Sequence, residues 1–364
     1  MIQAVKIQGF KSIKNLSLQL RNLTVLIGSN GVGKSNFISF FELTKAIFQQ
    51  NLGRYIMDNG GINTLLYKGR KVTEQVLGLL DFDNVNAFEF ILRPGQSGKG
   101  YINRTSDYFN KNSDNTKNYS LWHHKVWDTN VEESALSTNT LWRAGYLKKY
   151  LQDFTVYHFH DTSSSSPMRE PWDINDNVRM RDNGSNLAAF LFKLQQSDRK
   201  AYDLIEGTIK SVAPYFKRFV LAPDRNLSGK ISLEWEEIGS DMRLNGHSFS
   251  DGTIRFIALA TLLLQTDTPS VIIIDEPELG LHPTAINKFA SLVKRASRKS
   301  QIILSTQSTN LVNCFEPNNI LVVDRKEDQT VFRYLSADSL SIWLKDYNYC
   351  ISDLWEKNLI GGQL

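Results

Sequence analysis

The residues with the clearest chemical potential run from Gly28 to Ser35 and read Gly-Ser-Asn-Gly-Val-Gly-Lys-Ser. This spacing matches G-x-x-x-x-G-K-[ST], in which glycines let successive backbone N–H groups turn toward a phosphate. We expect Lys34 to reach the outer phosphates of a nucleotide and the Ser35 hydroxyl to ligate Mg²⁺. The predicted nucleotide-binding residues are Gly28, Ser29, Asn30, Gly31, Val32, Gly33, Lys34, Ser35 and Asn36.

A pair of carboxylates follows a continuous apolar run much later in the chain. Val271 to Ile274 are all β-branched, and Asp275 and Glu276 come directly after them. This pattern is typical of a Walker B strand, whose acids lie at the carboxyl end of a buried parallel strand. We expect Asp275 to hold Mg²⁺ through water and Glu276 to orient and activate the attacking water. The string Pro-Glu-Leu-Gly-Leu-His-Pro at 277–283 makes this interpretation more specific.

A third candidate lies between these two motifs. Ser250, Asp251 and Gly252 precede a helical pattern that begins with Ile254 and Ile257. A Ser-Asp-Gly turn at a helix N-terminus can bind an anion, and the alternative is an ordinary helix cap.

The neighbouring residues predict the elements that position these groups. Residues 23–27 read as a buried strand, and the phenylalanines after the loop recur at helical spacing, so strand, loop and helix follow one another. Alternating patterns predict strands around 5–20, 76–82 and 87–92. We therefore expect an α/β fold with the sequence divided into 1–95, an insertion at 96–245, and 246–364.

The insertion has the less regular pattern. Residues 95–140 predict loops and short hairpins, and His123 with His124 reads as a surface pair and not as a metal site. The serine-rich segment 161–167 predicts a mobile connection. Two helices are predicted between 187 and 212, and their basic side could meet a phosphate backbone or simply be solvated. That side contains Arg199, Lys200, Lys210, Lys217 and Arg218.

Composition sets broad limits on the kind of protein. The chain has 364 residues, 41% hydrophobic and 22% charged, and its net charge of +4 favours no particular partner. With Cys314 and Cys350 alone, the sequence has no disulfide framework and no cysteine-based metal cluster. It has no apolar run long enough to span a membrane. We expect a soluble, cytoplasmic protein with no membrane partner.

The chain resembles the soluble branch of the ATP-binding cassette superfamily, namely the RecF, SMC and OLD-like ATPases. The resemblance rests on the order of three motifs: the P-loop at Gly28–Ser35, the turn at Ser250–Gly252 and the acids Asp275–Glu276. Gly9 to Ser12 and Leu354 to Gly362 extend the resemblance over nearly the whole chain. It implies an ABC-type P-loop NTPase head, with a mixed β-sheet, flanking helices and a largely helical insertion. ATP and Mg²⁺ would be bound. Ser250, Asp251 and Gly252 would act on the nucleotide of a second protomer, which implies a homodimer.

The chain departs from the family pattern at one point of chemical importance. Where the family places a switch histidine in Ser-Thr-His-Ser, residues 305–308 read Ser-Thr-Gln-Ser. Gln307 can hydrogen-bond the γ-phosphate or the attacking water, but it cannot carry the imidazole proton. We therefore expect a slow ATPase with Glu276 and Gln307 as its catalytic residues.

The resemblance also suggests a biological role. The OLD family joins this ATPase to a C-terminal TOPRIM nuclease, and too few residues follow Ser308 for such a domain. We therefore expect a dimeric switch that senses or controls a separately encoded nuclease or toxin in bacterial anti-phage defence. The alternative is a RecF- or SMC-like clamp that binds DNA in repair or recombination. A transporter ATPase is disfavoured because the turn lacks Gly-Gly-Gln, and a nuclease is disfavoured because no second acidic or histidine cluster is found.

Overall fold

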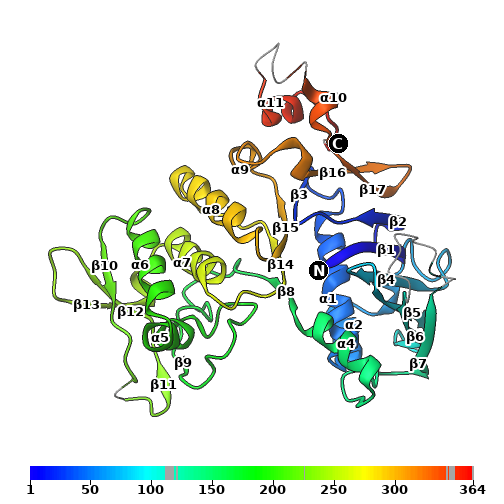
Figure 1. Cartoon of the computed structure of the whole chain (residues 1–364), viewed down its shortest axis with the longest axis horizontal. Helices are drawn as coiled ribbons and strands as arrows, with labels where there is room; N and C mark the ends of the chain where they lie inside the picture. Colours follow the sequence, from blue (N-terminus) through cyan, green and yellow to red (C-terminus); the bar gives the residue numbers. More distant parts are fainter. Residues whose placement is uncertain (111–118, 120–121, 225, 342, 344–348, 363–364) are drawn as a thin grey trace. The chain divides into compact units, whose positions relative to one another are not determined.

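The computed structural model describes residues 1–110, 119, 122–224, 226–341, 343 and 349–362. The chain forms two compact units. Unit 1 contains Met1–Phe154 and Glu316–Leu364, and unit 2 contains Thr155–Phe315. In Figure 1 unit 1 is coloured from blue to blue-green and then orange to red, whereas unit 2 is mostly green and yellow.

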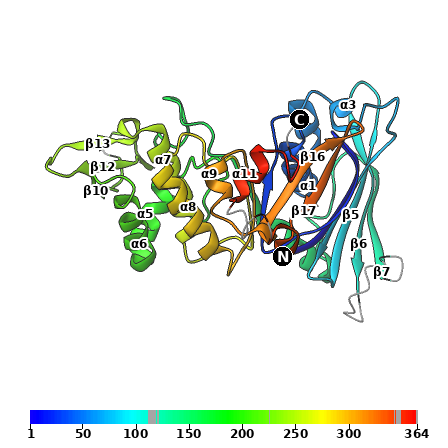
Figure 2. The same ribbon diagram turned by 90° about the horizontal axis from the view of Figure 1, so that it is seen from above.

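Unit 1 is built on a six-stranded antiparallel sheet with the order β2-β1-β4-β5-β6-β7. Figure 2 shows β5, β6 and β7 as long neighbouring strands. The strands are β1 (Ile2–Phe10), β2 (Ile13–Gln19), β4 (Val76–Phe82), β5 (Asn86–Pro94), β6 (Gly100–Phe109) and β7 (His123–Val131).

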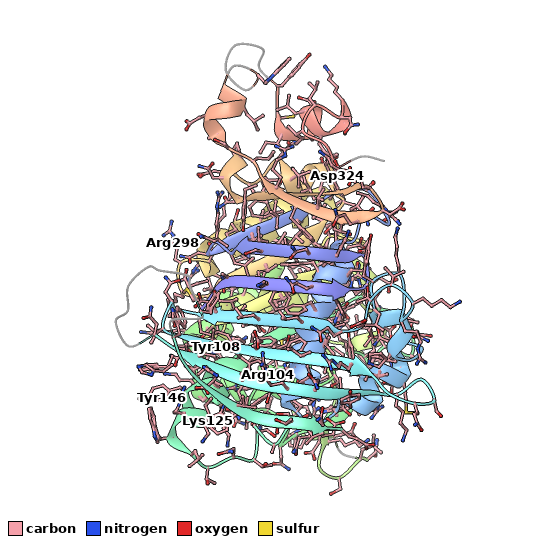
Figure 3. All side chains as sticks on the ribbon, turned by 90° about the vertical axis from the view of Figure 1, so that its right-hand side faces the viewer. Arg104, Tyr108, Lys125, Tyr146, Arg298 and Asp324 are labelled. Atoms are coloured by element: carbon pink, nitrogen blue, oxygen red, sulfur yellow. The ribbon has the colours of Figure 1, made fainter. Side chains whose placement is uncertain are left out.

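Strands β6 and β7 form an antiparallel hairpin within 95–140, where loops and short hairpins were predicted, and residues 111–118, 120 and 121 lie outside the described part of the chain. The predicted hairpin is confirmed, but its strands are longer than expected, because several inward positions are polar and apolar alternation is missing. Thr105 Oγ1 donates to Asp128 Oδ2 at 2.5 Å inside the hairpin. On the same sheet Arg104 and Tyr108 both donate to Glu89 (Figure 3). The His123–His124 pair is exposed, and no metal-type cluster is present among the described residues.

Unit 1 also carries the strands and helix that surround the P-loop. Strand β3 (Leu23–Ile27) runs parallel to β16 (Ile320–Lys326), which pairs antiparallel with β17 (Gln329–Tyr334). Helix α1 (Lys34–Phe48) buries Phe37, Phe40 and Phe41 completely, and their rings contact one another edge to face. The remaining helices are α2 (Leu52–Asp58), α3 (Ile62–Leu65), α4 (Trp142–Gln152), η3 (Pro317–Asn319), α10 (Ala337–Ser341) and α11 (Ile351–Glu356).

Unit 2 contains the other two motifs. Its central pair is β14 (Val271–Asp275) parallel to β15 (Gln301–Thr306), and β8 (Phe154–Tyr157) lies next to β14 at the start of the unit. The helices are α5 (Leu187–Ser197), α6 (Arg199–Lys210), η2 (Gly246–Ser248), α7 (Asp251–Leu264), α8 (Pro283–Ala296) and α9 (Thr309–Val312). Short strands are β9 (Trp172–Asp173), β10 (Phe216–Phe219), β11 (Lys230–Ile231), β12 (Glu234–Glu237) and β13 (Arg243–Asn245).

Several predictions about the insertion can be compared with these elements. Helices α5 and α6 confirm the helical pattern of 187–212. Segment 161–167 is a hydrogen-bonded loop instead of an open linker, since Ser166 is fully buried and donates to the Asp161 carbonyl at 2.6 Å. The predicted basic side is largely paired with acids: Arg199 with Asp203, and Lys217 and Arg218 with Glu236.

The division into 1–95, 96–245 and 246–364 stays a prediction, although the compact units have other boundaries. Strands β6 and β7 continue the sheet that contains β5, and β16 returns to β3, so both ends of the chain contribute to unit 1. Segment 96–245 contains strands as well as α4, α5 and α6, so it is more mixed than its pattern indicated. None of the described helices is both long and apolar enough to cross a membrane.

Candidate nucleotide site

The P-loop of unit 1 is held by close backbone packing. Gly28 has φ +158°, and a Cβ placed there would lie 2.5 Å from the Val323 carbonyl oxygen of β16. Gly33 has φ +113°, and its Cβ would lie 2.3 Å from Thr330 Oγ1 of β17. A side chain at either position would push the loop away from these strands. The two glycines therefore fix where the loop sits in unit 1.

Lys34 and Ser29 give the loop the character of an anion site. Lys34 is 5% exposed, and its ammonium donates to the carbonyls of Gly28 at 2.6 Å and Ser29 at 3.0 Å. The Ser29 hydroxyl is buried and has no hydrogen-bond partner. Helix α1 is preceded by the N-cap residue Gly33, which has no capping side chain, so the first-turn N–H groups can be offered to an anion. These donors fit the phosphates of a nucleotide.

A series of hydrogen bonds between hydroxyl and amide groups holds the P-loop in place. Asn36 Nδ2 donates to Ser12 Oγ at 2.7 Å, and Ser12 Oγ lies 2.6 Å from Thr330 Oγ1. Thr330 Oγ1 donates in turn to the Val32 carbonyl of the P-loop at 2.7 Å. Thr330 is 1% exposed, so water does not compete for these bonds. Sequence reasoning found Ser12 only as part of Gly-Phe-Lys-Ser and missed Thr330 altogether.

An open cavity of about 620 Å³ lies beside Ser12 and Asn36 in unit 1. Its polar lining includes Ser12 and Asn36, so it reaches the first turn of α1. Burial lowers the pKa of Lys11 in its wall, and the Lys11 ammonium donates to Asn59 Oδ1 at 3.3 Å. The lining residues are Lys11, Ser12, Asn36, Asn59, Thr64, Tyr67, Lys68, Arg325 and Asp328. The lining contains three cationic side chains and Asp328, which is paired with Lys68 at 3.0 Å, so the cavity is suited to a polar molecule.

The two acids after β14 lie in unit 2, at the end of its parallel strands. Asp275 is paired with Ser305 of β15, and the Ser305 hydroxyl donates to Asp275 Oδ1. Glu276 has φ +39°, a backbone conformation that few non-glycine residues adopt, and its N–H donates to the Ser305 carbonyl at 3.0 Å. Gln307 Nε2 donates to Glu276 Oε1. The structure thus brings together the two predicted catalytic residues, Glu276 and Gln307.

Glu278 holds the segment that carries Gln307. Its Oε1 accepts from Thr306 Oγ1 at 2.5 Å and from the Gln307 N–H at 3.0 Å, whereas its Oε2 is buried without a partner. Burial raises the pKa of this carboxyl, and the neighbouring Glu276 raises it further. Glu278 was visible in the 277–283 string, but its inward direction was not predictable from the string.

His160 is a further group near the acids that sequence reasoning missed. It is half-buried, and burial lowers its pKa although the charges of Asp275 and Glu276 act in the opposite direction. Its neutral imidazole can donate one hydrogen bond and accept another. His282, in contrast, is exposed and caps helix α8 by accepting from the Thr284 N–H at 3.3 Å.

The turn Ser250–Gly252, termed the signature turn below, is exposed at the start of α7. Ser250 is the helix cap, and its Oγ accepts from the Thr253 N–H at 3.2 Å. The capping interpretation is therefore confirmed, and the exposed helix start still leaves donors available to an anion. A Cβ on Gly252 would lie 2.2 Å from the Gly280 carbonyl oxygen. The signature turn thus contacts the loop 276–282 that carries Glu276.

Together, the P-loop between β3 and α1 and the acids after β14 define a P-loop NTPase head of ABC type. The chain belongs to the family described as "AAA domain, putative AbiEii toxin, Type IV TA system", whose model matches residues 23–313. Within that class it is an ABC-type ATPase of the RecF, SMC and OLD group.

Comparisons with individual proteins agree with this assignment. The chain is 23% identical over 379 residues to the Old nuclease of Escherichia phage P2. That alignment covers 93% of this chain and only 62% of the relative's length. An SMC head bound to the C-winged helix domain of ScpA has a TM-score of 0.63 at 16% identity, covering 93% of this chain and 99% of that one. An Smc head with an extended coiled coil, bound to the C-terminal domain of ScpA derived from Pyrococcus furiosus, has a TM-score of 0.55 at 14% identity, covering 96% and 99%.

The contact between the signature turn and loop 276–282 predicts the effect of a single methyl group. Gly252→Ala should destabilise unit 2 by about 1–3 kcal/mol because the methyl group meets the Gly280 carbonyl. The matched control is Gly207→Ala inside α6, where no atom lies within 4 Å and the change should be neutral or stabilising by up to about 1 kcal/mol. Thermal unfolding of both variants measures the difference, and equal melting temperatures would contradict the close approach.

The raised pKa of Glu278 predicts a pH-dependent effect of Glu278→Gln. The pKa of the carboxyl lies above 4.5 in the folded state, so the folded wild type binds the proton more tightly than the unfolded chain does. This contribution to stability is present at low pH and is lost as the pH rises through the raised pKa. Glutamine keeps an oxygen for Thr306 and Gln307 but never ionises. The melting temperature of the variant relative to wild type should therefore rise as the pH is raised above 4.5. A relative change in the opposite direction would show that Glu278 is ionised in the fold.

Proposed function

We propose that this protein is a slow, ATP-hydrolysing switch that acts as a homodimer. The observation that carries the proposal is the pairing of Gln307 with Glu276 beside an exposed signature turn, in a chain that also has a P-loop with a buried lysine. In this proposal each protomer carries two half-sites, and a complete nucleotide site needs one half-site from each of two protomers. One half is the P-loop of unit 1, and the other is the signature turn of unit 2.

The P-loop residues are proposed to hold ATP. Backbone N–H groups from Gly28 to Asn36 would surround the phosphates, and Lys34 would exchange its two carbonyl contacts for phosphate oxygens. Ser35 and Asp275 would hold Mg²⁺, which neutralises phosphate charge when bound. Their hydroxyl and carboxylate oxygens are ligands that Mg²⁺ prefers. The cavity beside the loop is lined by Lys11 and by Lys68, whose ammonium is paired with Asp328 at 3.0 Å.

Glu276 is proposed to accept the proton of the attacking water. Its Oε1 is held by the Gln307 amide, and Glu278 fixes the backbone of Gln307, so the base is oriented before a nucleotide arrives. Gln307 can donate a hydrogen bond but cannot transfer a proton. Slow hydrolysis follows from this arrangement, and slow hydrolysis suits a switch whose ATP-bound state must persist.

The signature turn is proposed to close over the nucleotide of a second protomer. Ser250 and Asp251 are exposed, and the N-terminus of α7 points its free donors outward from the turn. Ser250, Asp251 and Gly252 would then contact the γ-phosphate only in the dimer. ATP would hold the two copies together, and hydrolysis would release them.

The output of the switch is proposed to be a separately encoded nuclease or toxin in bacterial anti-phage defence. Two findings support this role: the family description names a toxin and a toxin–antitoxin system, and the phage relative is called a nuclease. One of the similar SMC heads is bound to the C-winged helix domain of ScpA, so a head of this fold can serve as a platform for another protein. We place the switch in the cytoplasm with no membrane partner.

A DNA clamp of RecF or SMC type is the second candidate, and the likeness to SMC heads supports it. The ion pairs of Arg199 with Asp203 and of Arg218 with Glu236 weigh against it, because they reduce the positive charge offered to a phosphate backbone. We therefore favour the protein effector.

Glu276→Gln should trap the ATP-bound dimer. The amide cannot accept a proton, so hydrolysis should fall by about 10²–10⁴-fold while ATP binding is retained. Light scattering after gel filtration should show a dimer with ATP and Mg²⁺ and a monomer without nucleotide. Lys34→Ala is the control and should stay monomeric in both conditions. A Glu276→Gln protein that binds ATP and remains monomeric would contradict the composite site.

The effector proposal predicts a stable protein complex. Purification of the chain expressed with its neighbouring genes should yield a stoichiometric nuclease or toxin, whose release or activation depends on Lys34. The clamp predicts instead that the chain alone binds DNA in an ATP-dependent way, with affinity falling steeply as salt rises. Strong ATP-dependent DNA binding with no protein partner would overturn the effector role.

A further inference from the structure

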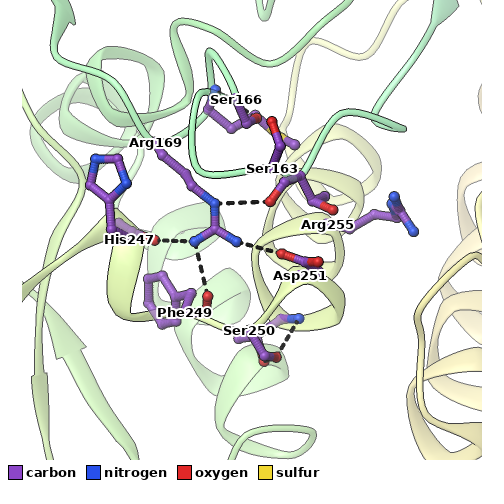
Figure 4. A network of polar contacts seen from close by, with 12 residues as sticks. Ser163, Ser166, Arg169, His247, Phe249, Ser250, Asp251 and Arg255 are labelled. Carbon is purple, nitrogen blue, oxygen red and sulfur yellow. Dashed lines mark hydrogen bonds and ion pairs between the residues drawn. The ribbon is translucent and has the colours of Figure 1, made fainter.

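Arg169 is a buried arginine that belongs to none of the sequence motifs. It lies in the loop between β8 and β9, and its side chain is only 4% exposed. Figure 4 shows its guanidinium at the centre of a network that reaches the signature turn. Nη1 donates to the carbonyls of Gly246 at 2.7 Å and Phe249 at 2.9 Å. Nη2 donates to Asp251 Oδ1 at 2.8 Å.

These bonds hold the backbone before Ser250 and a side chain after it. The carbonyls of Gly246 and Phe249 precede Ser250 and the Asp251 carboxylate follows it, so one planar guanidinium group supports the chain where it enters α7. Nε donates to the Thr162 carbonyl at 3.1 Å, which ties the guanidinium to the loop that starts at residue 161. The packing is also close, because a Cβ on Gly246 would lie 3.4 Å from Arg169 Cα.

The two members of the Arg169–Asp251 ion pair differ in their exposure to solvent. Asp251 is 66% exposed while Arg169 is 4% exposed, so the charge of the guanidinium is desolvated and that of its partner faces solvent. Loss of the guanidinium would remove a donor from the buried carbonyls of Phe249 and Gly246 and leave Gly246 with the weaker Phe249 N–H bond at 3.3 Å, so the turn would move to find water. A lysine cannot replace it, since one ammonium cannot reproduce the geometry of a planar fork.

We propose that Arg169 is a positioning residue for the signature turn, and that through the turn it acts on the nucleotide bound by the other protomer. This inference rests on the proposed composite site. It makes a specific assignment: Arg169 serves the signature half of unit 2 and has no role in the P-loop half of its own chain. A second protomer with an intact signature turn should therefore restore the ATPase activity that a change at Arg169 removes.

The first test separates binding from turnover. Arg169→Lys should bind a fluorescent ATP analogue within about twofold of wild type, because the P-loop is untouched, and should lose turnover on the order of 10²-fold because the turn is misplaced. Arg199→Ala is the matched control, since it removes another Arg–Asp pair of unit 2 at the surface and should leave turnover unchanged. Wild-type turnover in Arg169→Lys would overturn the proposal.

The decisive test mixes two inactive variants. Lys34→Ala has no working P-loop but an intact signature turn, and Arg169→Lys has the reverse. Their heterodimer contains one complete composite site, so mixing should restore ATPase activity that neither protein has alone. The reference is a parallel mixture of Lys34→Ala with Ser250→Arg, in which the arginine side chain blocks the signature turn directly. The ATPase activity of this mixture shows how much activity one intact composite site restores. A protein that merely unfolds when Arg169 is changed gives no recovery.

The outcomes distinguish the two proposals. Recovery in both mixtures supports the positioning role. Recovery with Ser250→Arg but not with Arg169→Lys overturns the role of Arg169 and leaves the composite site standing. No recovery in either mixture overturns the composite site and this inference with it. If Arg169→Lys does not fold, Asp251→Asn at the surface replaces it, and recovery of that variant by Lys34→Ala is the expected result.

Discussion

Two backbone turns touch where Gly252 faces the carbonyl of Gly280, and the candidate chemistry of unit 2 depends on this contact. The absence of a side chain at residue 252 brings the start of α7 against the loop that carries Glu276. Arg169 holds the same turn from its other side, and the β14–β15 pairing fixes Asp275 opposite Ser305. In the proposed composite site, a shift of the signature turn would displace loop 276–282 and would change the orientation of Glu276.

The P-loop of unit 1 is organised by the same kind of contact. Backbone approaches at Gly28 and Gly33, and hydroxyl bonds from Ser12 and Thr330, fix the loop without a charge. The buried ammonium of Lys34 donates to backbone carbonyls, which are weaker acceptors than phosphate oxygens. A rigid loop with an exchangeable lysine contact is what a site needs if nucleotide binding is to change its state.

Sequence reasoning was reliable where the signal is local. The strand, loop and helix around the P-loop, the strand before Asp275 and the cap at Ser250 each follow from residues close together in the chain. The supports were not predictable, because their partners are distant: Ser12 and Thr330 are 318 residues apart, and Arg169 and Asp251 are 82 apart. The length of strands β6 and β7 was not predicted for a different reason, since polar pairs such as Thr105–Asp128 occupy buried positions and erase the alternating pattern.

The central claim is that Ser250 of one protomer faces the P-loop of another when ATP is bound. Cross-linking measures it most directly, in a background where the free Cys314 and Cys350 are changed to serine. One copy carries Asn30→Cys and a differently tagged copy carries Ser250→Cys, both with Glu276→Gln to preserve ATP. A short bismaleimide should join the two copies only when ATP and Mg²⁺ are present. A cross-link that forms equally without ATP, or no cross-link between copies under any condition, would contradict the account.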